Sequence, residues 1–390
     1  MFGFGRTKSY LGVDLGAGGV KLVELKEEKK RPVLFTYGFT TGSQNVHHLL
    51  DKKDLTATQL MEKTSGAGTG KEADNALNRA FMVDDAQVER YANVIRSVCA
   101  EAKVKTKTAV ASLPVSAVFH AIVTLPMVKK EDFDRILRAE VKKLLPYPLE
   151  EVVLDSQIIP GAEGAVSQKV LVNAVPRALV VFYTKVFKLA GLTLESLEPE
   201  SVALSRSLIG RDAATTMLID IGAERTNFFI IDQAIPITHH SLEMGGKRIN
   251  AVLEKLLGLE PGITEQMKRD VFTHLIEGGN SGNGILPRAK FLEFFNSIID
   301  PILKEIEYSL ELFLRQSDNQ NKHPEKIVLT GGGALFPYLT EEIANRFKVK
   351  CYIGDPWGRV VYQDGLRPIL RSIAPRLAVS IGLALRNVVY

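Results

Sequence analysis

The sequence predicts an α/β fold of two related domains, with a small α+β subdomain inserted into the first. Three observations lead to this prediction. An apolar strand that ends in Asp, then a glycine turn and a second strand, occurs near the start of the chain and again after Thr215. Residues 114–194 alternate strand and helix patterns within a short length, which is typical of a small separate sheet. The chain has 390 residues, enough for two domains.

The composition is that of a soluble globular protein, with 45% hydrophobic and 24% charged residues. A net charge of +4, from 49 basic and 45 acidic residues, is too small to indicate a nucleic-acid partner. Two cysteines, Cys99 and Cys351, exclude a disulfide framework and a cysteine metal cluster. No apolar run is long enough to cross a bilayer, and the first ten residues lack the apolar stretch of a signal peptide. We therefore expect a cytoplasmic protein.

The first domain opens with three predicted strands, Tyr10–Asp14, Lys21–Leu25 and Val33–Phe39, separated by turn residues. Residues 41–83 show little periodicity and are predicted to be a flexible insertion. The motif GAGTGK within them lacks a preceding strand and a following apolar helix, which excludes a phosphate loop there. Order resumes near Asp84 with a helix that has one apolar face, followed by a strand through Val110 and Leu113.

The inserted subdomain is predicted to contain a strand, a helix, two further strands and a second helix. The first strand has Val123 and Leu125 on one face, and the later strands are expected at 152–159 and 169–175. The second helix is expected to run from Pro176 to Gly191. The first helix is expected to turn six apolar residues inward: Phe133, Ile136, Leu137, Val141, Leu144 and Leu145.

The outer face of that first helix is basic. We expect a solvated face, with weak affinity for anionic lipid or an acidic partner as the alternative. Its basic residues are Lys129, Lys130, Arg135, Arg138, Lys142 and Lys143.

The second domain repeats the strand-turn-strand pattern from Thr215 and continues with helices and one further strand. Helices are expected near 246–257, 264–277 and 287–315, the last bent at Pro301. A strand at 326–330, a helix ending at Phe347 and a terminal helix from Pro375 complete the chain.

The two hairpins, YLGVDLGAGGVKLVEL and TTMLIDIGAERTNFFII, have the design of phosphate-binding loops. Glycines beside a turn let successive backbone N–H groups approach phosphate oxygens. Asp14 and Asp220, each at a strand end, suit a hydrated Mg²⁺ ion, and Lys21 adds a positive charge near the phosphates. Either hairpin alone would usually be only a hairpin, but two of them could bind one nucleotide from both sides. The predicted backbone contacts are Gly16, Ala17, Gly18, Gly19, Gly222, Ala223 and Thr226.

A third element, IVLTGGGALFPYL, runs from a strand through Gly331, Gly332 and Gly333 into a helix. A turn without side chains lets adenosine lie against the backbone. The alternative is a strand-to-helix turn that requires positive φ, but three successive glycines exceed that need, so we favour contact with a ligand.

With these motifs the chain resembles the actin, sugar-kinase and heat-shock-chaperone ATPase superfamily. Residues 14–21 and 220–226 resemble its two phosphate motifs, and residues 330–334 its adenosine motif. Glu198-Pro199 resembles the first connecting helix, and residues 378–384 the second. MGGKRI, with Gly246 and Lys247, resembles the segment after the second hairpin. In TEQMKR, the resemblance implies that Glu265 and Lys268 reach ribose and adenine.

The inserted subdomain narrows this resemblance to the FtsA/PilM branch, which carries such a module before the first connecting helix. ASLPVSAV, KKLLPYPLEEVVLDSQII and AGLTLESLEPESVAL are similar to the PilM family of type IV pilus assembly proteins. The resemblance implies an actin-like ATPase fold with five parts. These are 1–113, 114–194 as the inserted subdomain, 195–210 as the connecting helix, 211–372 as the second domain, and 373–390 as a helix that returns to the first domain.

The same resemblance implies a cytoplasmic ATP-binding scaffold of pilus assembly and twitching motility, bound at the inner membrane through partners. The implied partners are the N-terminal peptide of a PilN-like membrane protein, in a groove between the inserted subdomain and the first domain, and the pilus motor ATPases. The implied cofactors are ATP and Mg²⁺, with Glu198 and Asp220 as candidates for positioning water. Gly18-Gly19 and Glu224-Arg225 depart from the usual loops, so we expect slow or no hydrolysis.

Two other functions of this fold are alternatives. A sugar or acetate kinase would need a general base facing a substrate pocket, and no residue is clearly placed for that. An FtsA-like cell-division scaffold would need an amphipathic membrane-binding helix at the C-terminus. The sequence LAVSIGLALRNVVY has almost no polar face and instead favours a packed core helix.

Overall fold

The computed structural model describes residues 8–40, 85–146, 148–159, 166–258, 288–316, 319–320 and 322–388. The predicted insertion at 41–83 and the predicted helix at 264–277, with Glu265 and Lys268, lie outside these residues. The chain divides into two compact units. The first is Met1–Ala203 with Val379–Tyr390, and the second is Leu204–Ala378.

The first unit is built on a five-stranded sheet in the order β3-β2-β1-β4-β8. β1, β2 and β3 form an antiparallel meander, while β4 and β8 run parallel to β1. The strands are β1 (Ser9–Gly16), β2 (Gly19–Glu28), β3 (Arg31–Phe39), β4 (Thr108–Leu113) and β8 (Thr193–Pro199).

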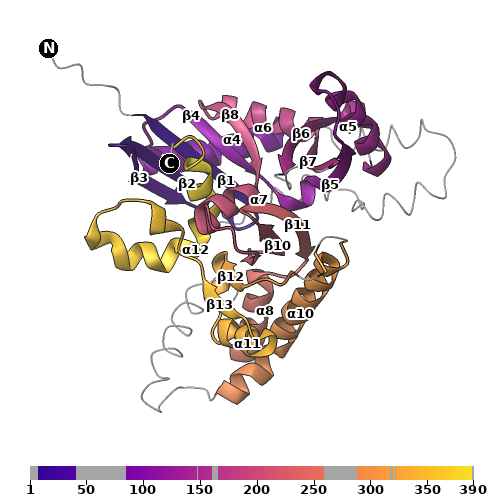
Figure 1. Ribbon diagram of the computed structural model, residues 1–390. Coiled ribbons are helices and arrows are strands. Elements are labelled where there is room, and N and C mark those ends of the chain that lie inside the picture. The colour runs from indigo at the N-terminus through magenta and orange to yellow at the C-terminus, as the bar shows by residue number, and fades with distance from the viewer. Residues whose placement is uncertain are drawn as a thin grey trace. The chain divides into compact units, whose positions relative to one another are not determined.

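One face of this sheet is covered by α4 (Asp85–Glu101) and α6 (Arg177–Leu189), which pack side by side (Figure 1). The predicted apolar face of α4 is confirmed, because Val88, Tyr91 and Ile95 are buried in the core of the first unit. α6 contributes to the same core through residues such as Phe182 and Phe187. α6 corresponds to the predicted second helix of the inserted subdomain, but its apolar stripe packs on the five-stranded sheet.

The opposite face of the sheet is covered by the C-terminal part of α12 (Arg367–Ala384). A Cβ atom at Gly12 would lie 2.1 Å from the carbonyl oxygen of Ser380. A Cβ atom at Gly382 would lie 1.9 Å from the carbonyl oxygen of Ala203. Glycine is therefore required at both positions, because the backbones approach too closely for any side chain.

The inserted subdomain has a three-stranded antiparallel sheet in the order β5-β7-β6, with α5 packed against one face (Figure 1). Its core contains Val123, Leu125, Leu137 and Val141. Leu144, predicted to face inward, is 46% exposed. It is the last residue of α5, and the chain becomes extended at Leu145. The elements are β5 (Phe119–Pro126), α5 (Lys130–Leu144), β6 (Val152–Ile159) and β7 (Ser167–Pro176).

The second unit repeats the strand order of the first, as β11-β10-β9-β12-β13. β9, β10 and β11 again form an antiparallel meander, and β12 and β13 run parallel to β9. The strands are β9 (Thr216–Ile221), β10 (Thr226–Asp232), β11 (Ile235–Leu242), β12 (Lys326–Thr330) and β13 (Lys350–Ile353). The helices are α8 (Gly246–Leu257), α10 (Arg288–Leu314), which includes Pro301, and α11 (Leu339–Phe347).

Two helix predictions differ from the structure. The predicted connecting helix 195–210 begins only at Glu200, because Thr193–Pro199 pairs with β4 as an edge strand. The helix continues as α7 (Glu200–Leu204) and a π-helical turn, Ser205–Ile209. The terminal helix begins at Arg367, and Pro375 lies inside it.

Among the described residues, no helix combines the length and the hydropathy that a membrane span requires.

Candidate functional site

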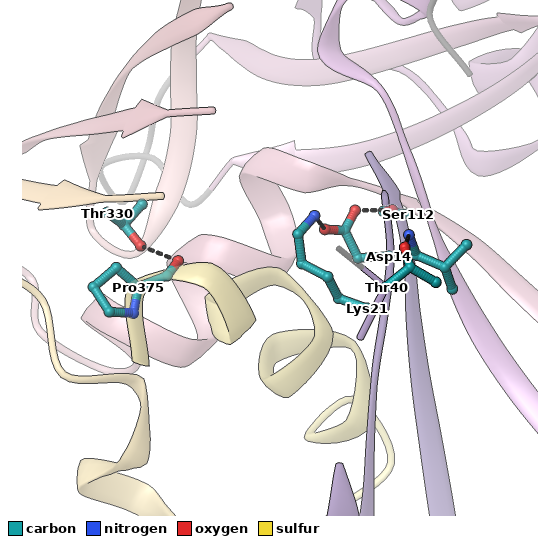
Figure 2. Close-up of polar contacts among 7 residues, drawn as sticks. Asp14, Lys21, Thr40, Ser112, Thr330 and Pro375 are labelled. Atoms are coloured by element: carbon teal, nitrogen blue, oxygen red, sulfur yellow. Dashed lines mark hydrogen bonds and ion pairs between the residues drawn. The ribbon is translucent and has the colours of Figure 1, made fainter. Parts of the chain in front are cut away.

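The first hairpin, β1–β2, positions Asp14 opposite Lys21 in the antiparallel register. The Lys21 Nζ atom lies 2.8 Å from Asp14 Oδ2, and the Ser112 hydroxyl donates to Asp14 Oδ1 at 2.8 Å (Figure 2). Asp14 is 4% exposed. Both oxygens of this buried carboxylate have partners, Lys21 for Oδ2 and Ser112 for Oδ1. A buried charge needs such partners, because desolvation alone would make it costly.

The turn of this hairpin is fixed by glycines and by Thr40. Gly16 and Gly19 are register partners, and Gly19 has φ of 109°. A Cβ atom at Gly16 would lie 3.0 Å from Lys21 Nζ, so a larger residue would press on the ion pair. The Thr40 hydroxyl accepts the Val20 N–H at 3.0 Å, which ties the hairpin to the end of β3 (Figure 2).

Ser112 and Glu198 share a row with Asp14 at the carboxyl ends of three parallel strands. The register places Asp14 beside Ser112, and Ser112 is paired with Glu198. Register partners in neighbouring strands point to the same face of a sheet. The Glu198 carboxylate, however, forms an ion pair with Arg386, with Nε and Oε1 2.7 Å apart. In this structure the Glu198 carboxylate is therefore paired with a cation. Its role in positioning water stays a prediction.

Glu200 is a buried carboxylate that the sequence analysis missed. It is 6% exposed, and its Oε2 accepts the Val115 N–H at 3.4 Å, just beyond β4. Tyr183 lies nearby, with a hydroxyl that is buried and has no hydrogen-bond partner among the described residues. Burial, with the negative charges of Glu200 and Asp14, holds the pKa of Tyr183 well above its usual value. No local pattern in the sequence marks Glu200, because its contact with Val115 joins segments that are far apart in the chain.

The second hairpin, β9–β10, carries Asp220 next to its turn. Gly222 donates its N–H to the Arg225 carbonyl at 2.9 Å and closes the turn. The carbonyls of Gly222 and Ala223 accept the N–H groups of Gly246 and Lys247 at 2.9 and 2.8 Å. The first turn of α8 is therefore packed on the hairpin, which brings together four of the predicted residues.

Two polar side chains of the second hairpin have partners within the protein. Thr226 is fully buried, and its hydroxyl donates to the Met244 carbonyl at 2.6 Å. Lys247 forms an ion pair with Glu224. Thr226 therefore anchors the hairpin to the segment before α8. Its contact with a nucleotide stays a prediction.

The glycine turn after β12 packs against the second hairpin. Gly331 has φ of 82°, and a Cβ atom there would lie 2.4 Å from Asp220 Oδ1. A Cβ atom at Gly333 would lie 2.3 Å from Ile221 Cγ2. At Gly332 the nearest atom would be the Arg376 Nε at 3.5 Å, an ordinary contact. Packing thus accounts for Gly331 and Gly333, whereas no close contact requires glycine at position 332. Contact of this turn with a ligand stays a prediction.

The backbone of this turn is joined to α12. The Gly331 N–H donates to the Pro375 carbonyl at 3.0 Å, and the Thr330 hydroxyl donates to the same oxygen at 3.3 Å (Figure 2). β12 and β9 are parallel, with Thr330 paired with Asp220. The turn, the hairpin and the start of α8 therefore form one compact group within the second unit.

Comparison with protein families finds a match to the family model described as type IV pilus assembly protein PilM, over residues 51–388. A solved structure of a PilM–PilN type IV pilus biogenesis complex is similar over 99% of this chain and 100% of that chain. Its TM-score is 0.74 at 22% sequence identity. The ethanolamine utilization protein EutJ from Carboxydothermus hydrogenoformans matches 97% of this chain and 90% of its own, with a TM-score of 0.52 at 13% identity. These similarities confirm the predicted actin-like α/β fold.

Proposed function

Because the chain belongs to the PilM family of type IV pilus assembly proteins, we propose that it is an ATP-binding scaffold of the pilus assembly machinery. In this proposal it acts in the cytoplasm at the face of the inner membrane. It binds the N-terminal tail of a PilN-like membrane protein and contacts the pilus motor ATPases. ATP with Mg²⁺ serves as a structural or switching ligand.

The observation that carries nucleotide binding is the repeated arrangement of an aspartate beside a glycine turn. Asp14 and Asp220 each lie near the end of the first strand of a hairpin, within sheets of identical strand order. Successive backbone N–H groups at such turns bind anions, and the Lys21 ammonium adds positive charge beside Asp14.

The residues present fit a magnesium ion held together with nucleotide phosphates. Mg²⁺ prefers carboxylate oxygens and keeps several waters, so it does not need a cluster of three protein ligands. No such cluster occurs among the described residues. Asp14 and Asp220 would hold the ion, directly or through water, and the ion would neutralise phosphate charge.

Thermal melting tests nucleotide binding. A ligand that binds only the folded protein raises the melting temperature with the logarithm of its concentration. We expect such a rise with millimolar Mg·ATP. Lys21→Ala should weaken ATP binding with and without magnesium, whereas Asp220→Asn should remove mainly the dependence on magnesium. A melting temperature unchanged by Mg·ATP would contradict ATP binding, and equal losses in both variants under both conditions would contradict the two roles.

Hydrolysis is expected to be slow or absent. Glu198 is paired with Arg386 in this structure, and Glu224 places an acid beside the second turn. Phosphate release under conditions that saturate the melting shift measures this rate. Rapid turnover would show that the protein works as an ATPase more than as a scaffold.

The scaffold role is supported by family membership and by the inserted subdomain, which carries none of the residues proposed for nucleotide binding. An extended peptide can bind through main-chain hydrogen bonds and apolar side chains. We would titrate the full chain with the N-terminal peptide of the PilN-like protein from the same organism, with and without Mg·ATP. Linkage requires that peptide and ATP change each other's affinity by the same factor. Absence of peptide binding in both conditions would exclude this partner. Equal binding in both conditions would leave the scaffold and remove the switch.

A further inference from the structure

A pocket in the inserted subdomain contains none of the residues proposed for nucleotide binding. Its volume is about 290 Å³. Leu149, Val152 and Leu154 give it apolar walls, while Arg138 and Arg177 bring two guanidinium groups. Glu150 also lines it, so the charged residues around the pocket are two cations and one anion. The pocket therefore combines apolar surface with a positive charge excess.

The pocket lies beside an unprotected sheet edge. Within the described chain, β6 pairs only with β7, so its other side has backbone groups with no strand partner. Its sequence, VVLDSQII, contains one charged residue and no proline. Val153 and Ile158 on this strand are 39% and 53% exposed. Edge strands are usually protected from pairing by lysine, proline or a bulge, and β6 has none of these devices.

The two arginines carry charge that the described protein does not balance. On α5, Arg135 pairs with Asp132 at 3.0 Å and Lys143 pairs with Glu140 at 2.7 Å. Arg138, on the same helix, has no ion pair with any described residue. Arg177 donates to the carbonyls of Glu150 and Val152 at 3.4 and 3.5 Å. These neutral acceptors orient the guanidinium but leave its charge available.

We propose that the β6 edge and the Arg138–Arg177 pocket form a docking site for an extended acidic segment of a partner protein. The segment adds as a strand beside β6 and forms main-chain hydrogen bonds along it. One of its apolar side chains enters the pocket, and an Asp or Glu binds the guanidinium groups. Arginine suits this role because its planar fork matches a carboxylate. A sheet edge favours a peptide over a membrane surface, because backbone hydrogen bonds need a strand partner.

The test uses the full chain and a fluorescent peptide of alternating valine and glutamate, measured by fluorescence anisotropy. A peptide of alternating valine and lysine is the control for charge. Arg138→Glu should weaken binding of the glutamate peptide about tenfold or more, since a charge-assisted hydrogen bond is worth about 1.5–3 kcal/mol. Arg135→Glu makes the same charge change on the same helix outside the pocket, and should weaken binding less than about twofold because surface ion pairs contribute little. Hydrogen exchange of the β6 amides should slow when the glutamate peptide binds.

Four results would overturn this docking site. Equal weakening by Arg138→Glu and Arg135→Glu would mean attraction to charge in general, and unchanged exchange in β6 would exclude strand addition. No binding of the glutamate peptide up to millimolar concentration would exclude the acidic segment. Binding to phosphatidylserine-containing vesicles that depends on Arg138, with no binding of the peptide, would assign the pocket to a membrane surface instead. Val153→Glu provides a second variant at the exposed edge, and it should also weaken binding of the glutamate peptide.

Discussion

Asp14, which we propose as a magnesium ligand, shows how a buried carboxylate is held within the protein. Its carboxylate is buried, and Lys21 and Ser112 occupy one oxygen each. Lys21 is itself mostly covered, with a side chain that is 18% exposed. Each member of the pair therefore depends on the other, because a single charge left in such a place would be poorly solvated.

Removing Lys21 should therefore cost stability as well as affinity. We expect Lys21→Ala to lower the free energy of unfolding by about 2 kcal/mol, because the buried Asp14 carboxylate loses its ion-pair partner. The double variant Asp14→Asn/Lys21→Ala should recover part of that loss, since no unpaired charge remains. Urea denaturation of the wild type, both single variants and the double variant measures this coupling. Strictly additive losses would contradict it.

At the residue scale, the sequence assigned Asp14 to a metal and Lys21 to phosphates, and did not predict that the two side chains pair with each other. The pair follows from a short hairpin, whose turn brings the two positions opposite each other. Ser112 and Glu200 were not predicted as site residues. Their contacts with Asp14 and Val115 depend on the register of strands and helices that are far apart in sequence. No periodicity within either segment contains that information.

At the element scale, the three successive glycines after β12 look alike in the sequence but differ in their surroundings. Gly331 and Gly333 are required by close packing on Asp220 and Ile221. A Cβ atom at Gly332 would instead lie at an ordinary contact distance from Arg376. Substitution by alanine at adjacent positions should therefore have different effects.

Gly331→Ala should destabilise the protein by more than about 2 kcal/mol, because it adds a side chain at positive φ against the Asp220 carboxylate. Gly332→Ala should keep the melting temperature within a few degrees but reduce the shift caused by Mg·ATP. Thermal melting of both variants, with and without Mg·ATP, tests this pair. If Gly332→Ala retained the full nucleotide shift, the turn would be a packing element only.

The bounds of several elements followed directly from their patterns. β6, β12 and α8 were predicted with the limits that the structure has, because each combines clear periodicity with distinct flanking residues. Residues 195–199 of β8 were predicted as part of the connecting helix, because that prediction rested on the family resemblance of Glu198-Pro199. Pairing with β4 decided its conformation, and that is a tertiary interaction.

At the scale of the whole molecule, the two units share one strand order but differ in how the chain forms them. Leu204–Ala378 is continuous, whereas the first unit takes Val379–Tyr390 from the far end of the sequence. In that segment the Ser380 carbonyl approaches Gly12, and Gly382 approaches the Ala203 carbonyl. Both approaches are so close that only glycine fits at positions 12 and 382. It also brings Arg386 to Glu198 at 2.7 Å.

A chain that ends at Ala378 should accordingly lose order in its first unit and keep it in the second. We expect fast hydrogen exchange in β1 and β4 of the truncated chain, and slow exchange in β9 and β12. Mass spectrometry of peptic fragments after brief labelling measures both regions in one experiment. Slow exchange in β1 of the truncated chain would show that the last segment is dispensable. Equal acceleration in β9 would show that the units do not fold separately.

This discontinuity sets an order of events during synthesis on the ribosome. The chain emerges from its N-terminus, and domains generally fold as units while synthesis proceeds. The strands of the first sheet appear early, but the helical segment that covers Gly12 and Ala203 is made only after the whole second unit. We therefore expect the second unit to be complete before the first, with the sheet face around Gly12 uncovered until the segment from Val379 onward has been made. A stop in translation between Ala378 and Gly382 would release a protein whose second unit can fold and whose first unit lacks its last segment.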